Sequence, residues 1–222
     1  MRLGLRYVRG LAEATGSALV TECERRGPFR DLADLCLRGR GSLTPEVVAA
    51  LIAAGACDGW GASRRQLLWA LPAIWRGAAG LALPPAPVAL PPETPLERAA
   101  GEGWATGVPL GTHPVATQRA ALTARGVVPI AALGDLPAGR VATIAGRIAV
   151  LQQPPTAKGV VFLSLEDETG LGNAVLSPAI AKQFRAALHA GPIVLVIGPV
   201  RRKGEVTSIQ VTDVAPWWLE DL

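Results

Sequence analysis

A basic loop, a β-strand and an acidic turn follow one another in Thr156-Ala-Lys-Gly-Val-Val-Phe-Leu-Ser-Leu-Glu-Asp-Glu-Thr-Gly170. Side chains alternate along this segment, with Val161, Leu163 and Leu165 on one face and Val160, Phe162, Ser164 and Glu166 on the other. Such alternation predicts a half-buried strand that has one face in a core and the other available. Lys158 and Gly159 place a cation and a flexible backbone beside the available face. This is how a small barrel presents a surface to a polyanion.

The sequence on either side of this strand predicts the rest of a barrel. Thr169-Gly170 predicts a turn. Further strands are expected at Val141–Val150, Asn173–Leu176, Ile193–Val200 and Val206–Val214, and helical spacing runs over Pro178–Ala190 after the cap Ser177. The order β-β-β-α-β-β over about 80 residues is that of the five-stranded OB-fold barrel. Arg201-Arg202-Lys203-Gly204 is expected to be the loop between the last two strands, where OB-folds hold oligonucleotides.

Composition favours two domains in a chain of 222 residues. Leu83–Pro92 contains five prolines, which predicts an extended linker. We therefore expect an α+β protein with a helical domain at 1–80, a Pro-rich linker with a connecting helical segment at 81–135, and the barrel at 136–222. The sequence has neither a long apolar run nor a charged and apolar leader, and its three cysteines are scattered. These features favour a cytoplasmic protein without a membrane span, a disulfide framework or a zinc site.

The first 80 residues have a helical pattern and hold 11 Lys and Arg against 7 Asp and Glu. Leu5–Arg9 and Ala12–Arg25 are expected to be helices around a turn at Gly10, and more helices are expected at Phe29–Arg38, from Thr44-Pro45, and at Ser63–Ile74. Two short helices around a glycine turn are typical of the helix-hairpin-helix, whose backbone amides hold a DNA phosphate without reading sequence. An ordinary helix–helix turn has the same pattern.

Several segments together resemble the C-terminal region of bacterial error-prone DNA polymerases, relatives of the DNA polymerase III alpha subunit. Arg2–Leu11 resembles the family's hairpin, Phe29–Asp34 its next helix, and Leu51-Ile-Ala-Ala-Gly-Ala-Cys-Asp58 its L-I-x-A-G-A-F-D segment. Thr106-Gly107 with Gly111-Thr-His-Pro114 is similar to its T-G and G-x-H-P segments, and residues 156–170 match its OB strand. Two departures are Ala12, where a second glycine is common, and Cys57, which replaces an aromatic residue.

The resemblance also implies what this chain lacks. The family's polymerase chemistry, repair-associated and error-prone, rests on aspartates that bind two metal ions in a palm domain upstream of this region. We therefore expect no catalytic residue, metal or cofactor here, with Mg²⁺ only in the absent polymerase domain, and no polymerisation by this chain alone. Glu166-Asp167-Glu168 is the densest acidic cluster, and a turn explains it better than a metal site does. His113 and His189 are expected to be structural or solvated.

Under this interpretation the helical domain holds primer–template backbone and the barrel holds single-stranded template. The residues expected to bind nucleic acid are Arg9, Gly10, Arg147, Lys158, Phe162, Arg201, Arg202 and Lys203. Phe162 would stack on a base, and the basic side chains would meet phosphates. Alternatively, Phe162 is a surface aromatic covered by the linker or by Trp217-Trp218.

Two other functions remain open. The chain is also compatible with a protein-interaction module that docks members of a lesion-bypass assembly through Trp217 and Trp218. The barrel is also compatible with an RNA-handling protein, such as the anticodon domain of a tRNA-ligating enzyme, although such proteins do not share the hairpin or the G-x-H-P segment.

Overall fold

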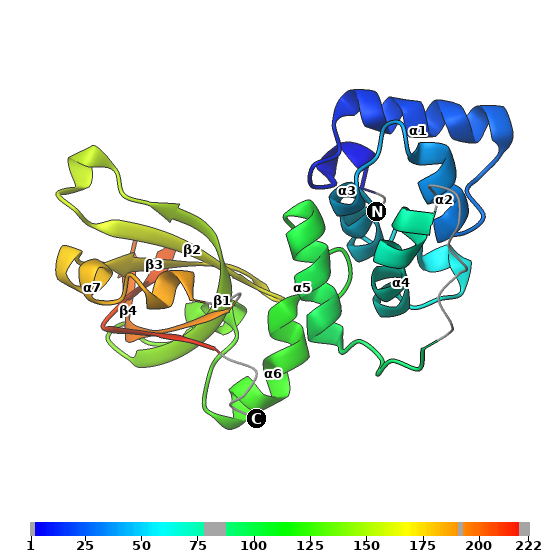
Figure 1. Cartoon of the computed structure of the whole chain (residues 1–222). Coiled ribbons are helices and arrows are strands. Elements are labelled where there is room, and N and C mark those ends of the chain that lie inside the picture. The colour runs from blue at the N-terminus through cyan, green and yellow to red at the C-terminus, as the bar shows by residue number, and fades with distance from the viewer. Residues whose placement is uncertain (1–2, 78–87, 191–192, 218–222) are drawn as a thin grey trace. The chain divides into compact units, whose positions relative to one another are not determined.

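The computed structural model describes residues 3–77, 88–190 and 193–217. The chain forms two compact units, Met1–Gly111 and Thr112–Leu222, and each has a hydrophobic core of its own. The first is helical and the second is built around a β-sheet (Figure 1). The segment 81–135, expected to connect two domains, is divided between these units. Residues 83–87 of the proline-rich stretch lie outside the described residues.

The helical unit consists of short helices, and side chains cap the first turns of α2, α3 and α5. Its elements are η1 (Leu5–Tyr7), α1 (Glu13–Arg26), α2 (Leu32–Gly39), α3 (Pro45–Ala53), η2 (Asp58–Trp60), α4 (Arg64–Gly77) and α5 (Pro95–Thr106). Thr44 caps α3 and Pro45 occupies its first turn, which confirms the expected helix start. Thr94 and Glu97 form a reciprocal capping box that begins α5.

The expected helix over Leu5–Arg9 is wrong. The structure has only the three-residue 3-10 turn η1 there, because Val8 is already extended and Gly10 turns the chain with a φ of 75°. The amide of Arg9 instead donates to the carbonyl of Ala105 in α5, at 2.7 Å. The turn at Gly10 itself is confirmed, and α1 follows it after Ala12, which provides no side-chain cap.

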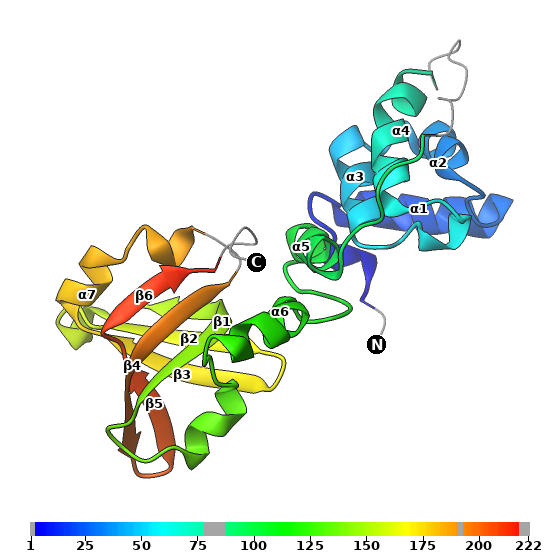
Figure 2. The same ribbon diagram turned by 90° about the horizontal axis from the view of Figure 1, so that it is seen from below.

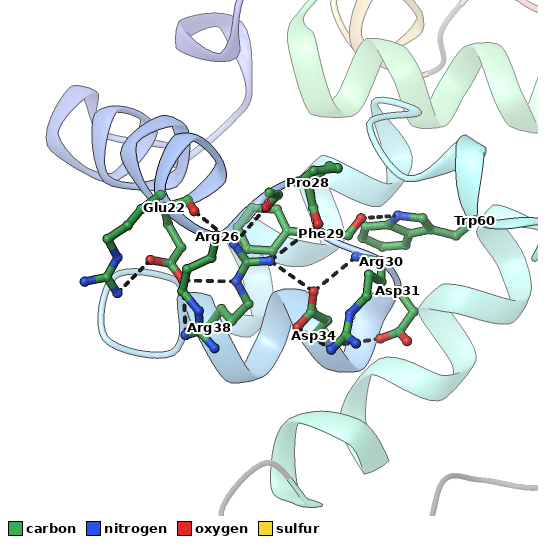
Figure 3. A network of polar contacts seen from close by, with 11 residues as sticks. Glu22, Arg26, Pro28, Phe29, Arg30, Asp31, Asp34, Arg38 and Trp60 are labelled. Carbon is green, nitrogen blue, oxygen red and sulfur yellow. Dashed lines mark hydrogen bonds and ion pairs between the residues drawn. The ribbon is translucent and has the colours of Figure 1, made fainter.

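A buried arginine ties the helical unit together around α2 (Figure 3). The side chain of Arg38 is 5% exposed, and its Nε donates to Glu22 on α1 at 3.0 Å while Nη1 donates to Asp34 at 3.1 Å. Its Nη2 donates to the carbonyls of Glu22 and Gly27, and its guanidinium lies 4.4 Å from the ring centroid of Phe29. This cation is therefore fully used within the protein.

The second unit is a closed barrel with the strand order β1-β2-β3-β5-β4, in which β4 also pairs with β1. Its strands are β1 (Val141–Gln152), β2 (Val161–Asp167), β3 (Gly170–Leu176), β4 (Val194–Lys203) and β5 (Val206–Gln210). Among the strands of the described residues, β3 and β5 alone pair in parallel, and the other neighbours are antiparallel. A short β6 (Asp213–Pro216) extends the sheet beside β4 (Figure 2). The expected five-stranded OB-fold is confirmed.

The expected strand Val206–Val214 is in fact two strands. β5 pairs with the second half of β4, whereas β6 pairs with its first half, from Val194 to Ile197. Between them, Val211 donates to the carbonyl of Val175 and Thr212 donates to that of Ile197, so the chain crosses from one neighbour to the other. Gly198 permits this crossing, since a Cβ there would lie 2.0 Å from the carbonyl oxygen of Gln210.

Helical elements pack against the strands of the barrel unit. α6 (Pro114–Ala124) packs against β1 and β2, and η3 (Ile130–Asp135) packs against β3. The expected helix at Pro178–Ala190 is shorter: α7 (Pro178–Gln183), capped by Ser177 as expected, is followed by the 3-10 turn η5 (Ala187–His189). A further 3-10 turn, η4 (Pro155–Ala157), lies in the β1–β2 connection. No helix within the described ranges is long and apolar enough to span a membrane.

Candidate nucleic-acid interface

The outer face of the barrel is laid out by strand register. The inner face of β2 carries Val161, Leu163 and Leu165, each no more than 5% exposed, as the alternation predicts. Pairing across the sheet aligns two rows on the opposite, outer face. One row contains Gln152, Phe162, Val175 and Gln210, and the other contains Val150, Ser164, Asn173, Ser208 and Arg201. The first row spans four strands and the second spans five, so the two rows form one continuous surface.

Phe162 lies in this surface with 41% of its area exposed. An exposed aromatic ring on the outer face of a barrel can stack on an unpaired base. Trp217 lies elsewhere in the same unit: it is 3% exposed and is buried with Val115 and Leu122. The covered-aromatic alternative for Phe162 therefore fails for Trp217, while Trp218 lies outside the described residues.

Lys158 lies in the β1–β2 connection, four residues before Phe162. It is exposed and has a φ of 50°, the left-handed conformation, and Gly159 follows with a φ of 84°. The loop then enters β2 at Val161, next to Phe162. No hydrogen bond or ion pair engages the Lys158 ammonium within the described residues, so this cation remains available to an anion.

The basic segment Arg201–Lys203 is the end of β4 and not a loop, which corrects the expectation from sequence. Its residues pair with Ser208, Thr207 and Val206 of β5, and the hairpin turn is Gly204-Glu205. A two-residue turn at a glycine with positive φ is enough to join antiparallel strands. Because strand side chains alternate, Arg201 and Lys203 share the outer face and Arg202 points to the other side.

Arg202 and Arg147 are already engaged by the protein. Arg202 donates through Nη2 to the carbonyls of Gly134 and Leu136, the latter at 2.9 Å, and so holds η3. Arg147 donates to Glu166 at 2.6 Å across β1 and β2. Arg201 and Lys203 are exposed, and no such partner is found for either in the described part of the chain. Of the predicted barrel cations, these two and Lys158 are free for a ligand.

The acidic motif at the end of β2 forms the turn. Asp167 has a fully buried side chain and accepts the amides of Ile130, Thr169 and Gly170, at 2.9, 2.7 and 3.2 Å. Arg119 of α6 pairs with Asp167 and Glu168. With Glu166 held by Arg147, all three carboxylates have protein partners. The described residues contain no group of three or more His, Cys, Asp or Glu arranged to hold a metal.

Neither histidine is a member of the outer rows. His113 caps α6, its Nδ1 accepting the amide of Val115 at 3.2 Å, and burial lowers the pKa of its imidazole. His189 lies in the short turn η5. Neither forms a nucleophile–base pair with another side chain among the described residues.

In the helical unit, Arg9 and Gly10 form an exposed turn ahead of α1. The guanidinium of Arg9 lies 5.4 Å from the ring centroid of Trp104 on α5, and that tryptophan is 49% exposed. Trp104 was not predicted from sequence. The hydrogen bond between Arg9 and Ala105 joins two segments far apart in the chain, and no pattern within either segment indicates it.

Two family models match the chain. A model described as a helix-hairpin-helix motif covers residues 1–67, and one described as an OB-fold nucleic acid binding domain covers residues 142–216. Error-prone DNA polymerase of Anaeromyxobacter sp. (strain K) is 36% identical over 97% of this chain, and that of Mycobacterium tuberculosis (strain ATCC 25618 / H37Rv) is 39% identical over 94%. The chain is similar to the C-terminal portion of error-prone DNA polymerases.

The similarity to error-prone DNA polymerases confirms the resemblance found in the sequence. The chain spans about a fifth of the length of the curated relatives, 19% of each of these two. Among known structures, aspartyl-tRNA synthetase from Entamoeba histolytica is similar to this chain. The match covers 40% of this chain and 21% of the synthetase, with 21% sequence identity and a TM-score of 0.34.

Sequence reasoning did not group Ser164, Asn173 and Ser208, although the structure aligns them on three neighbouring strands. The outward alternation of Ser208 and Gln210 was visible in the sequence. Their position beside β3 was not, because β3 and β5 are joined by a parallel pairing across the intervening helix and β4. The signal that was available is the alternation alone.

Proposed function

We propose that this chain is the nucleic-acid-binding C-terminal portion of an error-prone DNA polymerase that serves translesion synthesis in DNA repair. The barrel holds single-stranded template on its outer face, and the hairpin around Gly10 holds primer–template backbone. Both contacts tolerate different sequences, because phosphates and stacking dominate them. We propose no cofactor for this chain and a cytoplasmic location, with Mg²⁺ needed only by the family's polymerase domain.

The observation that carries this proposal is the outer face around Phe162. The exposed aromatic side chain follows the free cation Lys158 by four residues in the chain, and the free cations Arg201 and Lys203 lie at the β4 edge of the same face. Single-stranded DNA that crosses this face can therefore stack one base on Phe162, while its phosphates reach cations on both sides of the ring. The match to an OB-fold nucleic acid binding model over residues 142–216 supports the same assignment.

The test is the salt dependence of binding to a fluorescent single-stranded DNA oligonucleotide, measured by anisotropy between about 50 and about 200 mM salt. Replacing both Arg201 and Lys203 with alanine should reduce the slope of log K against log salt by about 1.4, since each phosphate contact to a single strand contributes about 0.7. The double variant Lys182→Ala/Arg185→Ala is the matched control. It removes the same charge from exposed residues in and after α7 and should leave the slope unchanged.

An unchanged slope in the first variant would remove the β4 edge from the site. Absence of binding at about 50 mM salt would contradict nucleic-acid binding by the isolated chain. An RNA oligonucleotide of the same sequence, measured in parallel, separates the DNA assignment from that of an RNA-handling module. Docking of lesion-bypass proteins through Trp217 has no support, because that side chain is in the core.

A further inference from the structure

The centre of the barrel's outer face consists of neutral polar side chains that have no hydrogen-bond partner among the described residues. Ser164, Asn173 and Ser208 are direct cross-strand neighbours on β2, β3 and β5. Within the described part of the chain, no hydrogen bond engages any of their three side chains. Asn173 is exposed and the two serines are half-buried. An unbroken row of free amide and hydroxyl groups thus runs across three strands of the face.

Phe162 and this row are placed to contact one nucleotide together. Phe162 and Ser164 are two residues apart on one face of β2, a separation of about 6.6 Å. Asn173 is diagonal to Phe162, because Phe162 pairs with Val175, and diagonal neighbours are about 7–8 Å apart and within reach of aromatic side chains. A base stacked on the ring can therefore reach the amide of Asn173 with its edge.

Charge is confined to the margins of this surface. In the two rows that hold Phe162 and Asn173, the charged member is Arg201, at the β4 end. A surface made only for phosphates would carry cations at its centre. The central groups are instead hydrogen-bond donors and acceptors, and a carboxamide can pair in a bidentate manner with the edge of a base.

We infer that Asn173, with Ser164 and Ser208 beside it, contacts the edge of the base stacked on Phe162, so that binding of single-stranded nucleic acid has a base preference at one position. This inference rests on the proposed function and refines it. Phosphate and stacking contacts hold any strand, and the Asn173 contact favours some bases over others at that nucleotide. Asn173 is thus a specificity-determining residue.

The experiment compares affinities of the 222-residue chain for fluorescent dT, dC and dA oligonucleotides of equal length at about 50 mM salt. Asn173→Ala should change at least one pairwise affinity ratio by about fivefold or more, the lower end of the discrimination that a bidentate base contact provides. Its salt slope should equal that of the unaltered chain, because no phosphate contact is lost. The test compares the affinity ratios of the variant with those of the unaltered chain. The ratios of the unaltered chain alone do not suffice, because bases in dA oligonucleotides also stack on one another.

Gln183→Ala is the matched control, because it removes an exposed carboxamide from α7 in the same unit. It should alter neither the ratios nor the salt slope. The Arg201→Ala/Lys203→Ala variant should lower the slope and keep the ratios. Thermal unfolding should show that Asn173→Ala remains folded, as expected for an exposed side chain.

Ratios that stay the same in Asn173→Ala would overturn the base contact while leaving the proposed function intact. Failure of every oligonucleotide to bind would overturn both. The two failures are distinguishable because only the second abolishes salt-dependent binding.

Discussion

Some arginine and lysine side chains of this protein bind groups of the protein itself, and others have no such partner among the described residues and are available to a ligand. Arg38, Arg64, Arg147 and Arg202 donate to carboxylates or carbonyls of their own unit. Lys158, Arg201 and Lys203 are exposed beside the outer face of the barrel and have no such partner among the described residues. Net charge therefore says little about which cations can meet a phosphate, and the contacts of each side chain decide it.

Acid should lower the stability of the helical unit by protonating the carboxylate of Asp34. Hydrogen bonds from Arg30 and Arg38 hold the pKa of this carboxyl at about 2, below its ordinary value of 3.8. A lowered pKa contributes stability that is present above about pH 4 and is lost as the pH falls through about 2. Urea denaturation of the chain across this range should show the loss, and Asp34→Asn should flatten it.

The matched control is Glu24→Gln, which changes an exposed carboxylate on α1 that has no hydrogen-bond partner within the described ranges. It should keep the pH profile of the unaltered chain. A profile of Asp34→Asn as steep as that of the unaltered chain would show that other groups cause the acid sensitivity.

At the scale of elements, Glu102 joins two helices to the segment that follows them. This buried carboxylate of α5 accepts from Arg64 of α4 at 3.0 Å and from the amides of Leu110 and Gly111 at 2.8 and 2.9 Å. Arg64 also pairs with Asp58 of η2. The G-x-H-P segment noted in the sequence thus begins at a residue whose amide is held by α5.

We expect Glu102→Ala to destabilise the helical unit by about 2 kcal/mol or more, because the amides of Leu110 and Gly111 lose their acceptor and the buried Arg64 keeps only one of its two carboxylate partners, Asp58. Urea denaturation at neutral pH measures this change. Glu97→Ala on the same helix is the control, since Glu97 is half exposed and its loss should be smaller. Equal losses in the two variants would argue that the ion pair with Arg64 adds little.

At the scale of the whole chain, the cores of the two units share no residue. The helical core includes Leu35, Val48 and Ile52, and the barrel core includes Ile144, Leu165 and Val196. All three cysteines are free and lie in the helical unit. A unit that has its own core can fold alone.

Residues 112–222 expressed alone should therefore unfold cooperatively. Circular dichroism of this fragment during heating tests the expectation, with the full chain measured beside it. A fragment that lacks a cooperative transition would show that the barrel depends on the helical unit. The same fragment should bind single-stranded DNA if the outer face of the barrel is the site.

Elements with local signals could be predicted from the sequence. Thr44-Pro45 and Ser177-Pro178 start helices because a cap and a first-turn proline act within one turn. The alternation in residues 161–165 fixed which side chains of β2 are buried, and the order of strands and helix indicated the OB-fold. These signals lie within a few residues, so a sequence displays them directly.

Contacts between distant residues follow from the folded chain and not from any local pattern. In the folded chain, Arg202 and Arg147 have protein partners and Trp217 is buried. Ser164, Asn173 and Ser208 are aligned beside Phe162. Ser208 joins this row because β3 pairs with β5, a strand that does not follow it in the chain. Pairing between distant strands depends on how the whole sheet curves and closes, and no local pattern records it.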